Sequence, residues 1–142
     1  MSQYKHLLVG LDLGKDCEKI LNKAVALAET LDAKISLLHA FEPLAFAYGG
    51  DVPIDLSQAQ DLMEQQATKR LSKIAQPFGI PLERQYVRIG QTSSELHYIA
   101  EQEGADLIIV GSHARHGLAA LFGNTAGGVI RGAECDVMAV KV

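Results

Sequence analysis

Apolar residues along the chain fall into short unbroken runs, separated by longer stretches in which they recur every three or four positions. The runs at residues 6–11 and 106–110 are typical of strands buried on both faces of a sheet, and residues 34–40 predict a further strand. Residues 84–89 alternate polar and apolar, which predicts a less buried strand nearer an edge. A last apolar run at residues 137–142 predicts a fifth strand.

The stretches between these runs have the spacing of helices. Apolar positions repeat at steps of three and four over residues 16–31 and, for longer, over residues 56–78. Thr92 and Glu95 have the spacing of a capping box and introduce a helix that runs to about residue 103. A fourth helix is predicted over residues 125–133, where three glycines indicate either close packing or a soft helix start.

Strand and helix alternate through the sequence, which predicts an α/β fold in a single domain spanning residues 1–142. The expected architecture is a doubly wound, five-stranded parallel sheet with helices on both faces. Right-handed crossovers and the apolar first and fourth strands favour the strand order 3-2-1-4-5. Ligands bind such sheets beyond the carboxyl ends of the strands, where the order reverses. Those ends carry Asp12 and Gly111-Ser112-His113, so we expect the two clusters to share one crevice.

Composition narrows the possible partners. The 142 residues carry a net charge of −4, and the lysines and arginines are scattered. A nucleic-acid-binding surface needs clustered basic residues, so we expect no nucleic-acid partner. No apolar run approaches the ~18 residues of a membrane span and no signal peptide is evident, so we expect a cytoplasmic protein without a membrane contact. Cys17 and Cys135 match no metal or redox spacing and are predicted to be reduced core thiols.

The segment after the fourth strand has the composition of a phosphate-binding loop. Gly111 either lets the backbone approach a ligand or simply forms the turn out of the strand. Asn124 and Thr125 begin the last helix, where free N–H groups either form an anion site or are capped without a ligand. Arg115 and His116 either neutralise a phosphate or are solvated surface residues.

Taken together, these patterns resemble the universal stress protein family of small cytoplasmic α/β domains. The likeness covers nearly the whole chain, through YKHLLVGLD, KISLLHA, ADLIIVGSHARHGLAALFGNTAGGVI and ECDVMAVKV. The C-terminal blocks are the specific part of the match. The resemblance implies a role in the stress response and, for the nucleotide-binding branch of the family, a site for ATP or another adenine nucleotide.

That branch carries glycine, two residues, glycine, nine residues, glycine, and then serine or threonine. Gly111 matches the first glycine, whereas Ala114 stands at the second. Gly123 follows after eight residues rather than nine, and Asn124 takes the Ser/Thr place with Thr125 next. Ala114 costs about 1 kcal/mol if its position requires a positive φ. Asn124 still offers its amide N–H groups to a phosphate.

Asp12 corresponds to the family's acidic residue that contacts adenine; from its position alone, it either accepts hydrogen bonds from a base or ribose or caps the first helix. The resemblance also places the backbone at Ala40 against the adenine. It implies a homodimer in which residues 137–142 pair antiparallel with a second copy, the alternative being a loop that covers this edge. The expected nucleotide-binding set is Asp12, Ala40, Gly111, Ser112, His113, Ala114, Arg115, His116, Gly123, Asn124 and Thr125.

No catalytic set is evident in the sequence. It has no P-loop Gly-Lys-Ser/Thr, no nucleophile elbow, and no metal-ligand spacing among its five histidines. Three hypotheses remain open. The first is a nucleotide-sensing binding module without dedicated catalysis that also engages protein partners. The second is a slow ATPase or nucleotidyl transferase using Asp12, His113 and Arg115, and the third is a nucleotide-free protein that acts by protein–protein contact.

Overall fold

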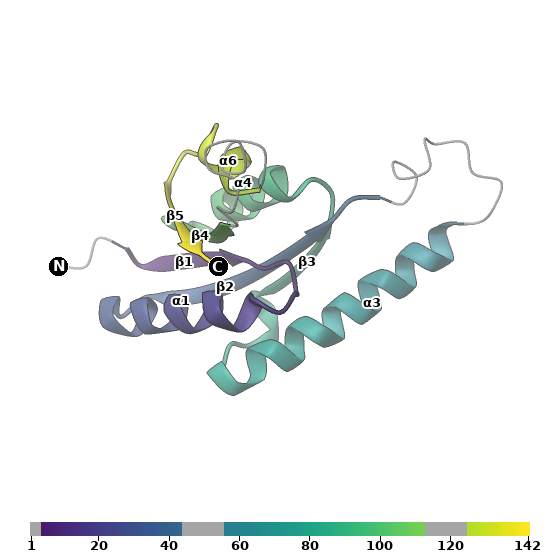
Figure 1. Ribbon diagram of the computed structural model, residues 1–142, viewed down its shortest axis with the longest axis horizontal. Helices are drawn as coiled ribbons and strands as arrows, with labels where there is room; N and C mark the ends of the chain where they lie inside the picture. Colours follow the sequence, from purple (N-terminus) through teal and green to yellow (C-terminus); the bar gives the residue numbers. More distant parts are fainter. Residues whose placement is uncertain (1–3, 44–55, 113–124) are drawn as a thin grey trace.

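A single parallel sheet organises the molecule (Figure 1). The computed structural model describes residues 4–43, 56–112 and 125–142. The five strands run in the order β3-β2-β1-β4-β5, and every neighbouring pair is parallel, which confirms the predicted topology. The strands are β1 (His6–Gly10), β2 (Lys34–Phe41), β3 (Gln85–Ile89), β4 (Leu107–Ser112) and β5 (Asp136–Lys141).

Helices cover both faces of this sheet, as predicted (Figure 1). On one face lie α1 (Cys17–Leu31) and α3 (Leu56–Ala75), and on the other lie α4 (Thr92–Glu103) and α6 (Thr125–Ile130). Within the described ranges, no helix is both long and apolar enough to cross a bilayer.

The core has two halves because side chains alternate across each strand. Leu7 and Val9 of β1 pack toward α1 and α3, while Leu8 packs toward α4 and α6. Every residue of β1 is buried, as expected of the central strand of a sheet covered on both faces. Each fully buried leucine contributes roughly 1.5–3 kcal/mol to folding.

Only the second half of α3 packs against the sheet. Ala67 and Leu71 are buried, whereas Ala59 is exposed and Met63 and Leu62 keep 36% and 54% of their surface. Figure 1 shows why: the beginning of α3 reaches beyond the ends of the strands. The periodicity over residues 56–78 correctly predicts a helix, but it carries no information about where the sheet beneath ends.

Two predicted helix ends differ in the structure. Helix α3 ends at Ala75 and is followed by the 3-10 turn η1 (Gln76–Phe78), in which Pro77 has no N–H to continue the α-helical hydrogen bonds. A second 3-10 turn, η2 (Leu82–Arg84), leads into β3. Helix α6 ends at Ile130 rather than residue 133, because Gly132 adopts φ +81° and turns the chain.

The capping box predicted at Thr92 and Glu95 is wrong. The N-cap of α4 is Gln91, and it makes no side-chain cap hydrogen bond. The carboxylate of Glu95 instead accepts a hydrogen bond from Arg88 Nε of β3 at 2.7 Å. A hydrogen bond to a charged guanidinium is stronger than one to a backbone N–H, so the Glu95 carboxylate pairs with Arg88 instead of capping the helix.

The first glycines of the last helix lie beside α4. Gly127 is buried, and a Cβ at Gly128 would lie 3.5 Å from the Cβ of Ser93 in α4. This is an ordinary van der Waals distance, so packing against α4 does not require glycine at position 128.

Candidate functional site

The strand order reverses between β1 and β4, so their carboxyl ends lie side by side. Leu7 pairs with Leu107 and Val9 with Ile109, and this register brings the two strands to the same edge of the sheet. The chain after β1 continues through Leu11 to Asp12, and β4 ends at Ser112. Asp12 and the pair Gly111-Ser112 therefore lie at the same carboxyl edge of the sheet, as expected, whereas His113 lies outside the described residues.

Asp12 shapes the loop between β1 and α1. Its Oδ1 accepts a hydrogen bond from the backbone N–H of Gly14 at 2.8 Å, an Asx-type turn. The N-cap position of α1 belongs to Asp16, so the reading of Asp12 as the helix cap is wrong. Asp12 is exposed at the carboxyl edge of the sheet, where a carboxylate can accept hydrogen bonds from a ligand.

Leu13 holds this loop in a conformation that leucine rarely adopts. Its φ is +62°, which costs roughly 1–2 kcal/mol for a residue with a side chain. The side chain is 9% exposed and belongs to the core beneath α1, and this burial offsets the strain. Sequence reasoning missed Leu13, because the neighbouring Gly14 is the residue that a left-handed conformation ordinarily favours.

Ala40 stands where β2 runs past the end of β1. The carbonyl of Leu38 accepts a hydrogen bond from the N–H of Leu11 at 2.9 Å, so Leu38 faces β1. Since backbone groups alternate along a strand, the N–H and C=O of Ala40 point to the same side, beyond the last residue of β1. This is the placement expected of a backbone that faces a base, and the contact itself stays a prediction.

His39 joins β2 to the loop after β1, a role that the sequence did not reveal. Its ring nitrogen Nδ1 lies 2.8 Å from the carbonyl oxygen of Leu11. A carbonyl only accepts, so Nδ1 carries the hydrogen and donates it. The imidazole also stacks with Phe41 at a ring-centroid distance of 6.3 Å. The residue before Asp12 is thereby held to the second strand.

Gly111 has a packing reason to be glycine. It lies within β4 rather than in a turn, and a Cβ there would approach Cδ1 of Ile20 in α1 to 2.6 Å. The reading of Gly111 as a simple turn out of the strand is therefore wrong. Ser112 next to it is buried, and its carbonyl accepts a hydrogen bond from the N–H of Val142 at 3.1 Å. The end of β4 is thus clamped between α1 and the segment after β5.

Comparison with known proteins agrees with this architecture. The model of the universal stress protein family matches residues 3–141. The chain belongs to this family. Universal stress protein A homolog 2 of Coxiella burnetii is 38% identical to it over 146 residues, covering 100% of this chain and 98% of the relative.

Solved structures of the universal stress protein family share its fold. Universal stress protein UspA from Lactobacillus plantarum has a TM-score of 0.76 at 19% identity and covers 99% of each chain. A universal stress protein solved in complex with cAMP has a TM-score of 0.65 at 22% identity over 97% of each chain. At these identities the comparison establishes the arrangement of strands and helices.

Part of the expected universal stress protein motif lies outside the described residues. Thr125 is the first residue of α6, as expected of a residue at a helix start. In the described ranges, no group of three or more histidine, cysteine, aspartate or glutamate residues is arranged to hold a metal ion. The predicted ligand residues outside the described ranges are His113, Ala114, Arg115, His116, Gly123 and Asn124.

Cys17, the first residue of α1, is a buried thiol. Burial raises its pKa to about 11, and the carboxylate of Asp12 adds to the effect. The thiol therefore stays protonated at neutral pH and is a poor nucleophile. Cys135 is also a free thiol, and burial is again the main reason that its pKa is raised. Cys17 is a core thiol as expected, whereas Cys135 is only partly buried.

Proposed function

We propose that this universal stress protein binds an adenine nucleotide, ATP in the first place, at the carboxyl edge between β1 and β4. The observation that carries the proposal is the convergence of Asp12, the backbone of Ala40 and the end of β4 at the point where the strand order reverses. The related universal stress protein solved with cAMP supports the ligand class, because cAMP is an adenine nucleotide.

In this proposal one set of groups binds the adenine and ribose, and a second set binds the phosphates. The carboxylate of Asp12 accepts hydrogen bonds from the adenine or ribose, and the backbone at Ala40 lies against the base. The segment from Gly111 to Thr125 supplies N–H groups and positive charge for the phosphates. Asn124 replaces the hydroxyl of the family motif with an amide donor.

The test begins with the ligand itself. Freshly purified protein is denatured, any released small molecule is identified by mass spectrometry, and ATP is then titrated by calorimetry. Asp12→Ala should weaken ATP binding roughly tenfold, because a hydrogen bond to a charged group contributes about 1.5–3 kcal/mol. Asp61→Asn, an exposed change on α3, is the control and should leave the affinity unchanged.

A second variant examines the departure from the family motif. Ala114→Gly should tighten ATP binding if the alanine impairs the loop, and unchanged affinity would show that alanine already fits. Absence of both released ligand and calorimetric heat would sink the nucleotide proposal. It would favour the nucleotide-free alternative, a protein that acts through protein partners.

We further propose that the site senses nucleotide rather than turning it over. A slow ATPase is the alternative, and it predicts phosphate release above background that disappears in the double variant Asp12→Ala/His113→Ala. Phosphate release that is equal in the parent and the double variant argues against it. The cytoplasmic stress-response role is part of the same proposal and rests on membership of the family.

The homodimer is proposed to form through β5, which lies at the end of the strand order. Because the N–H of Val142 points to β4, alternation directs the N–H of Ala139 toward the open edge. Ala139→Pro should therefore remove an intersubunit donor while sparing the bonds to β4. Light scattering after size exclusion should report a monomer for Ala139→Pro and a dimer for Ala139→Ser. A dimer in both variants would place the contact elsewhere.

A further inference from the structure

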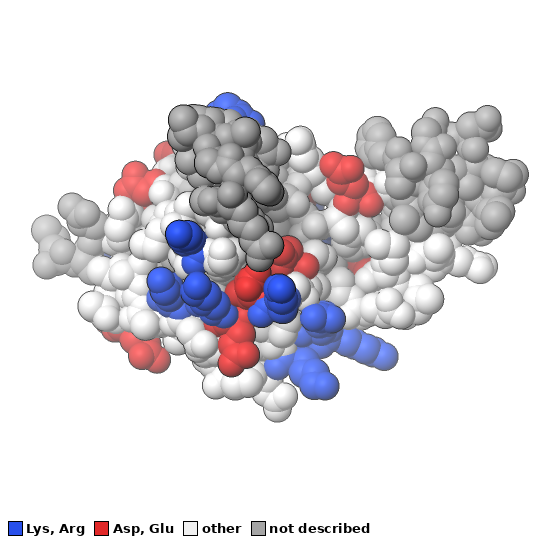
Figure 2. Space-filling view, viewed as in Figure 1, with Lys and Arg blue, Asp and Glu red and all other residues white. Residues whose placement is uncertain are grey.

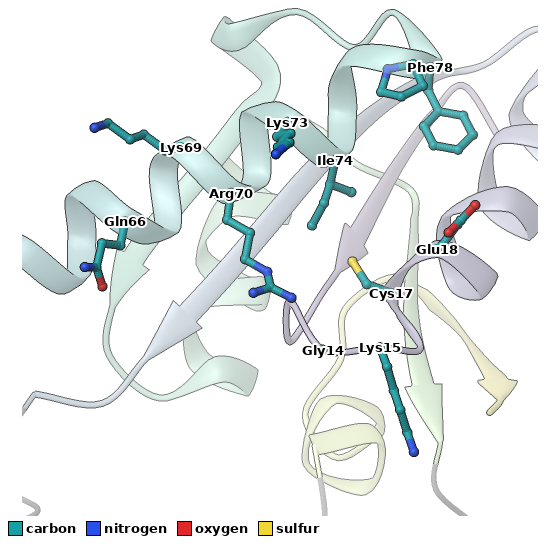
Figure 3. Close-up of a pocket in the computed structure, with 11 residues that line it drawn as sticks. Gly14, Lys15, Cys17, Glu18, Gln66, Lys69, Arg70, Lys73, Ile74 and Phe78 are labelled. Atoms are coloured by element: carbon teal, nitrogen blue, oxygen red, sulfur yellow. The ribbon is translucent and has the colours of Figure 1, made fainter.

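A cavity of about 820 Å³ opens between the start of α1 and the second half of α3 (Figure 3). Its floor is apolar. Cys17 is buried, and Ile74 and Phe78 pack against the core while keeping part of their surface exposed. In Figure 3 the side chains of Ile74 and Cys17 point toward one another across the floor. The two helices lie on the same face of the sheet, yet they leave apolar surface between them uncovered.

The rim of this groove is positively charged. Lys69, Arg70 and Lys73 come from α3 and Lys15 comes from the turn before α1. Figure 2 shows lysine and arginine side chains gathered over the middle of α3. The chain as a whole has a net charge of −4, so this concentration of cations runs against its overall balance. A local field of this sign attracts anions.

Arg70 is the cation best placed to hold a ligand. Figure 3 shows it extending from α3 toward the turn at Gly14 and Lys15, across the mouth of the groove. Within the described residues Arg70 and Lys73 form no ion pair; the one pair joins Arg88 and Glu95. The guanidinium therefore keeps its planar set of donors for a carboxylate or phosphate.

Among the described residues that line the groove, Glu18 in the first turn of α1 is the one with an acidic side chain. The negative charge of Glu18 repels an anionic ligand head from the α1 side of the groove, so the head is expected on the α3 side. Cys17 brings no competing negative charge, because burial raises the pKa of its thiol to about 11. An apolar floor and a cationic rim on one side define the polarity of the occupant.

We propose that this groove binds an organic anion with an apolar body. The body lies over Cys17, Ile74 and Phe78, and a carboxylate, sulfonate or phosphate head contacts Arg70 and Lys73. The cavity volume lies within the range of roughly 300–1,000 Å³ that is usual for small-molecule sites. The groove is distinct from the described part of the nucleotide site, because Asp12, Ala40, Gly111 and Ser112 are not among its lining residues.

The test is a fluorescence titration of the full chain with the probe 1-anilinonaphthalene-8-sulfonate, an aromatic body with an anionic head. The double variant Arg70→Gln/Lys73→Gln should weaken probe binding about tenfold, since two exposed ionic contacts are lost. Lys19→Gln/Lys23→Gln is the matched control. It removes the same charge from exposed positions of α1 outside the groove, and it should change the affinity less than about twofold.

Competitors distinguish the chemistry of the occupant. Decanoate, decyl phosphate and decanol share one chain and differ in the head, so displacement by the two anions but not by decanol is expected. Backbone amide shifts in two-dimensional NMR should move at Cys17, Ile74 and Phe78. Equal probe affinity in both double variants, displacement by decanol as effective as by decanoate, or shifts confined to other residues would each overturn the proposal. Displacement by ATP that requires Arg70 would make the groove a nucleotide site and overturn it too.

Discussion

The two ends of the sheet are built for different purposes. At the amino end, polar groups bind one another. The carboxylate of Asp106 accepts hydrogen bonds from the N–H groups of Lys5 at 2.9 Å and His6 at 3.1 Å. The buried imidazole of His6 lies 2.6 Å from the hydroxyl of Ser36 and 3.1 Å from the carbonyl oxygen of Glu103. These bonds tie β1, β2 and β4 together.

At the carboxyl end the same strands stop around an exposed carboxylate, a strained leucine and a glycine chosen for its small volume. Asp12 accepts a hydrogen bond from the N–H of Gly14 in its own loop, Leu13 adopts φ +62°, and the missing side chain of Gly111 leaves room for Ile20. At the amino end of the sheet, polar groups stabilise the fold by bonding to one another. At the carboxyl end, packing holds polar groups at the surface. The second arrangement is the one that leaves room for a ligand.

The largest expected effect comes from filling the space at Gly111. Gly111→Ala puts a Cβ 2.6 Å from Cδ1 of Ile20, and overpacking of this kind should lower the free energy of unfolding by about 2–3 kcal/mol. Ile20→Val removes that Cδ1 and alone costs about 0.5–1.5 kcal/mol. In urea unfolding the double variant should therefore be more stable than the sum of the two losses predicts.

Gly128→Ala is the control for this experiment. Its Cβ would meet Ser93 at an ordinary 3.5 Å, so no destabilisation is expected. Strictly additive losses for Gly111→Ala and Ile20→Val would show that the clash is absorbed elsewhere. The carboxyl end would then be less tightly packed than the comparison states.

At the amino end, Asp106→Ala should cost about 2 kcal/mol. The substitution removes the acceptor of two backbone N–H groups, and unmade hydrogen bonds of this kind cost roughly 1–3 kcal/mol. Asp136→Ala is the matched control, since Asp136 accepts a hydrogen bond from Tyr4 at an exposed site and its loss should leave stability almost unchanged. Equal midpoints for the two variants in urea unfolding would remove the stabilising role assigned to Asp106.

The fold could be predicted because its signals are local in the sequence. The apolar runs of β1 and β4 identify strands buried on both faces, and this burial, together with right-handed crossovers, places them in the middle of the sheet. Periodicity likewise identifies α3. Residues distant in the sequence determine what a helix packs against, so helical periodicity could not predict that Met63 and Leu62 are exposed.

The candidate site could be located from the sequence but not described by it. Asp12 and Ser112 were placed at one edge because parallel strands end together. The close approach at Gly111 depends on Ile20, which is remote in the sequence, and the left-handed Leu13 is signalled by no residue type. Glu95 shows the converse error: a capping-box spacing was present, but a cation on β3 took the carboxylate.

A smaller effect tests the strain at Leu13. Leu13→Ala and Leu13→Gly both lose the buried side chain, but only glycine adopts φ +62° without penalty. The glycine variant should therefore be more stable than the alanine variant by about 1 kcal/mol in urea unfolding. At the neighbouring Leu11, which is buried without a positive φ, the order should reverse and alanine should be the better replacement. The same order at both positions would mean that Leu13 stores no strain.

The smallest expected effect is a pH dependence from the amino end. Because a carbonyl only accepts, Nδ1 of His6 donates to Glu103, and Nε2 accepts from the Ser36 hydroxyl. Burial lowers the pKa of His6, an effect that the carbonyl of Glu103 and the carboxylate of Asp106 oppose and that Lys34 and Arg84 reinforce. The unfolded chain therefore binds the proton more readily than the folded one.

As pH falls through the ordinary histidine pKa of about 6.5, the free energy of unfolding should fall, and it should level off once folded His6 is also protonated. The difference in unfolding free energy between the parent and His6→Gln, measured from pH 8 to pH 5, should shrink over this interval. If the unfolding free energies of the parent and His6→Gln differ by the same amount from pH 8 to pH 5, folding does not change the proton affinity of His6.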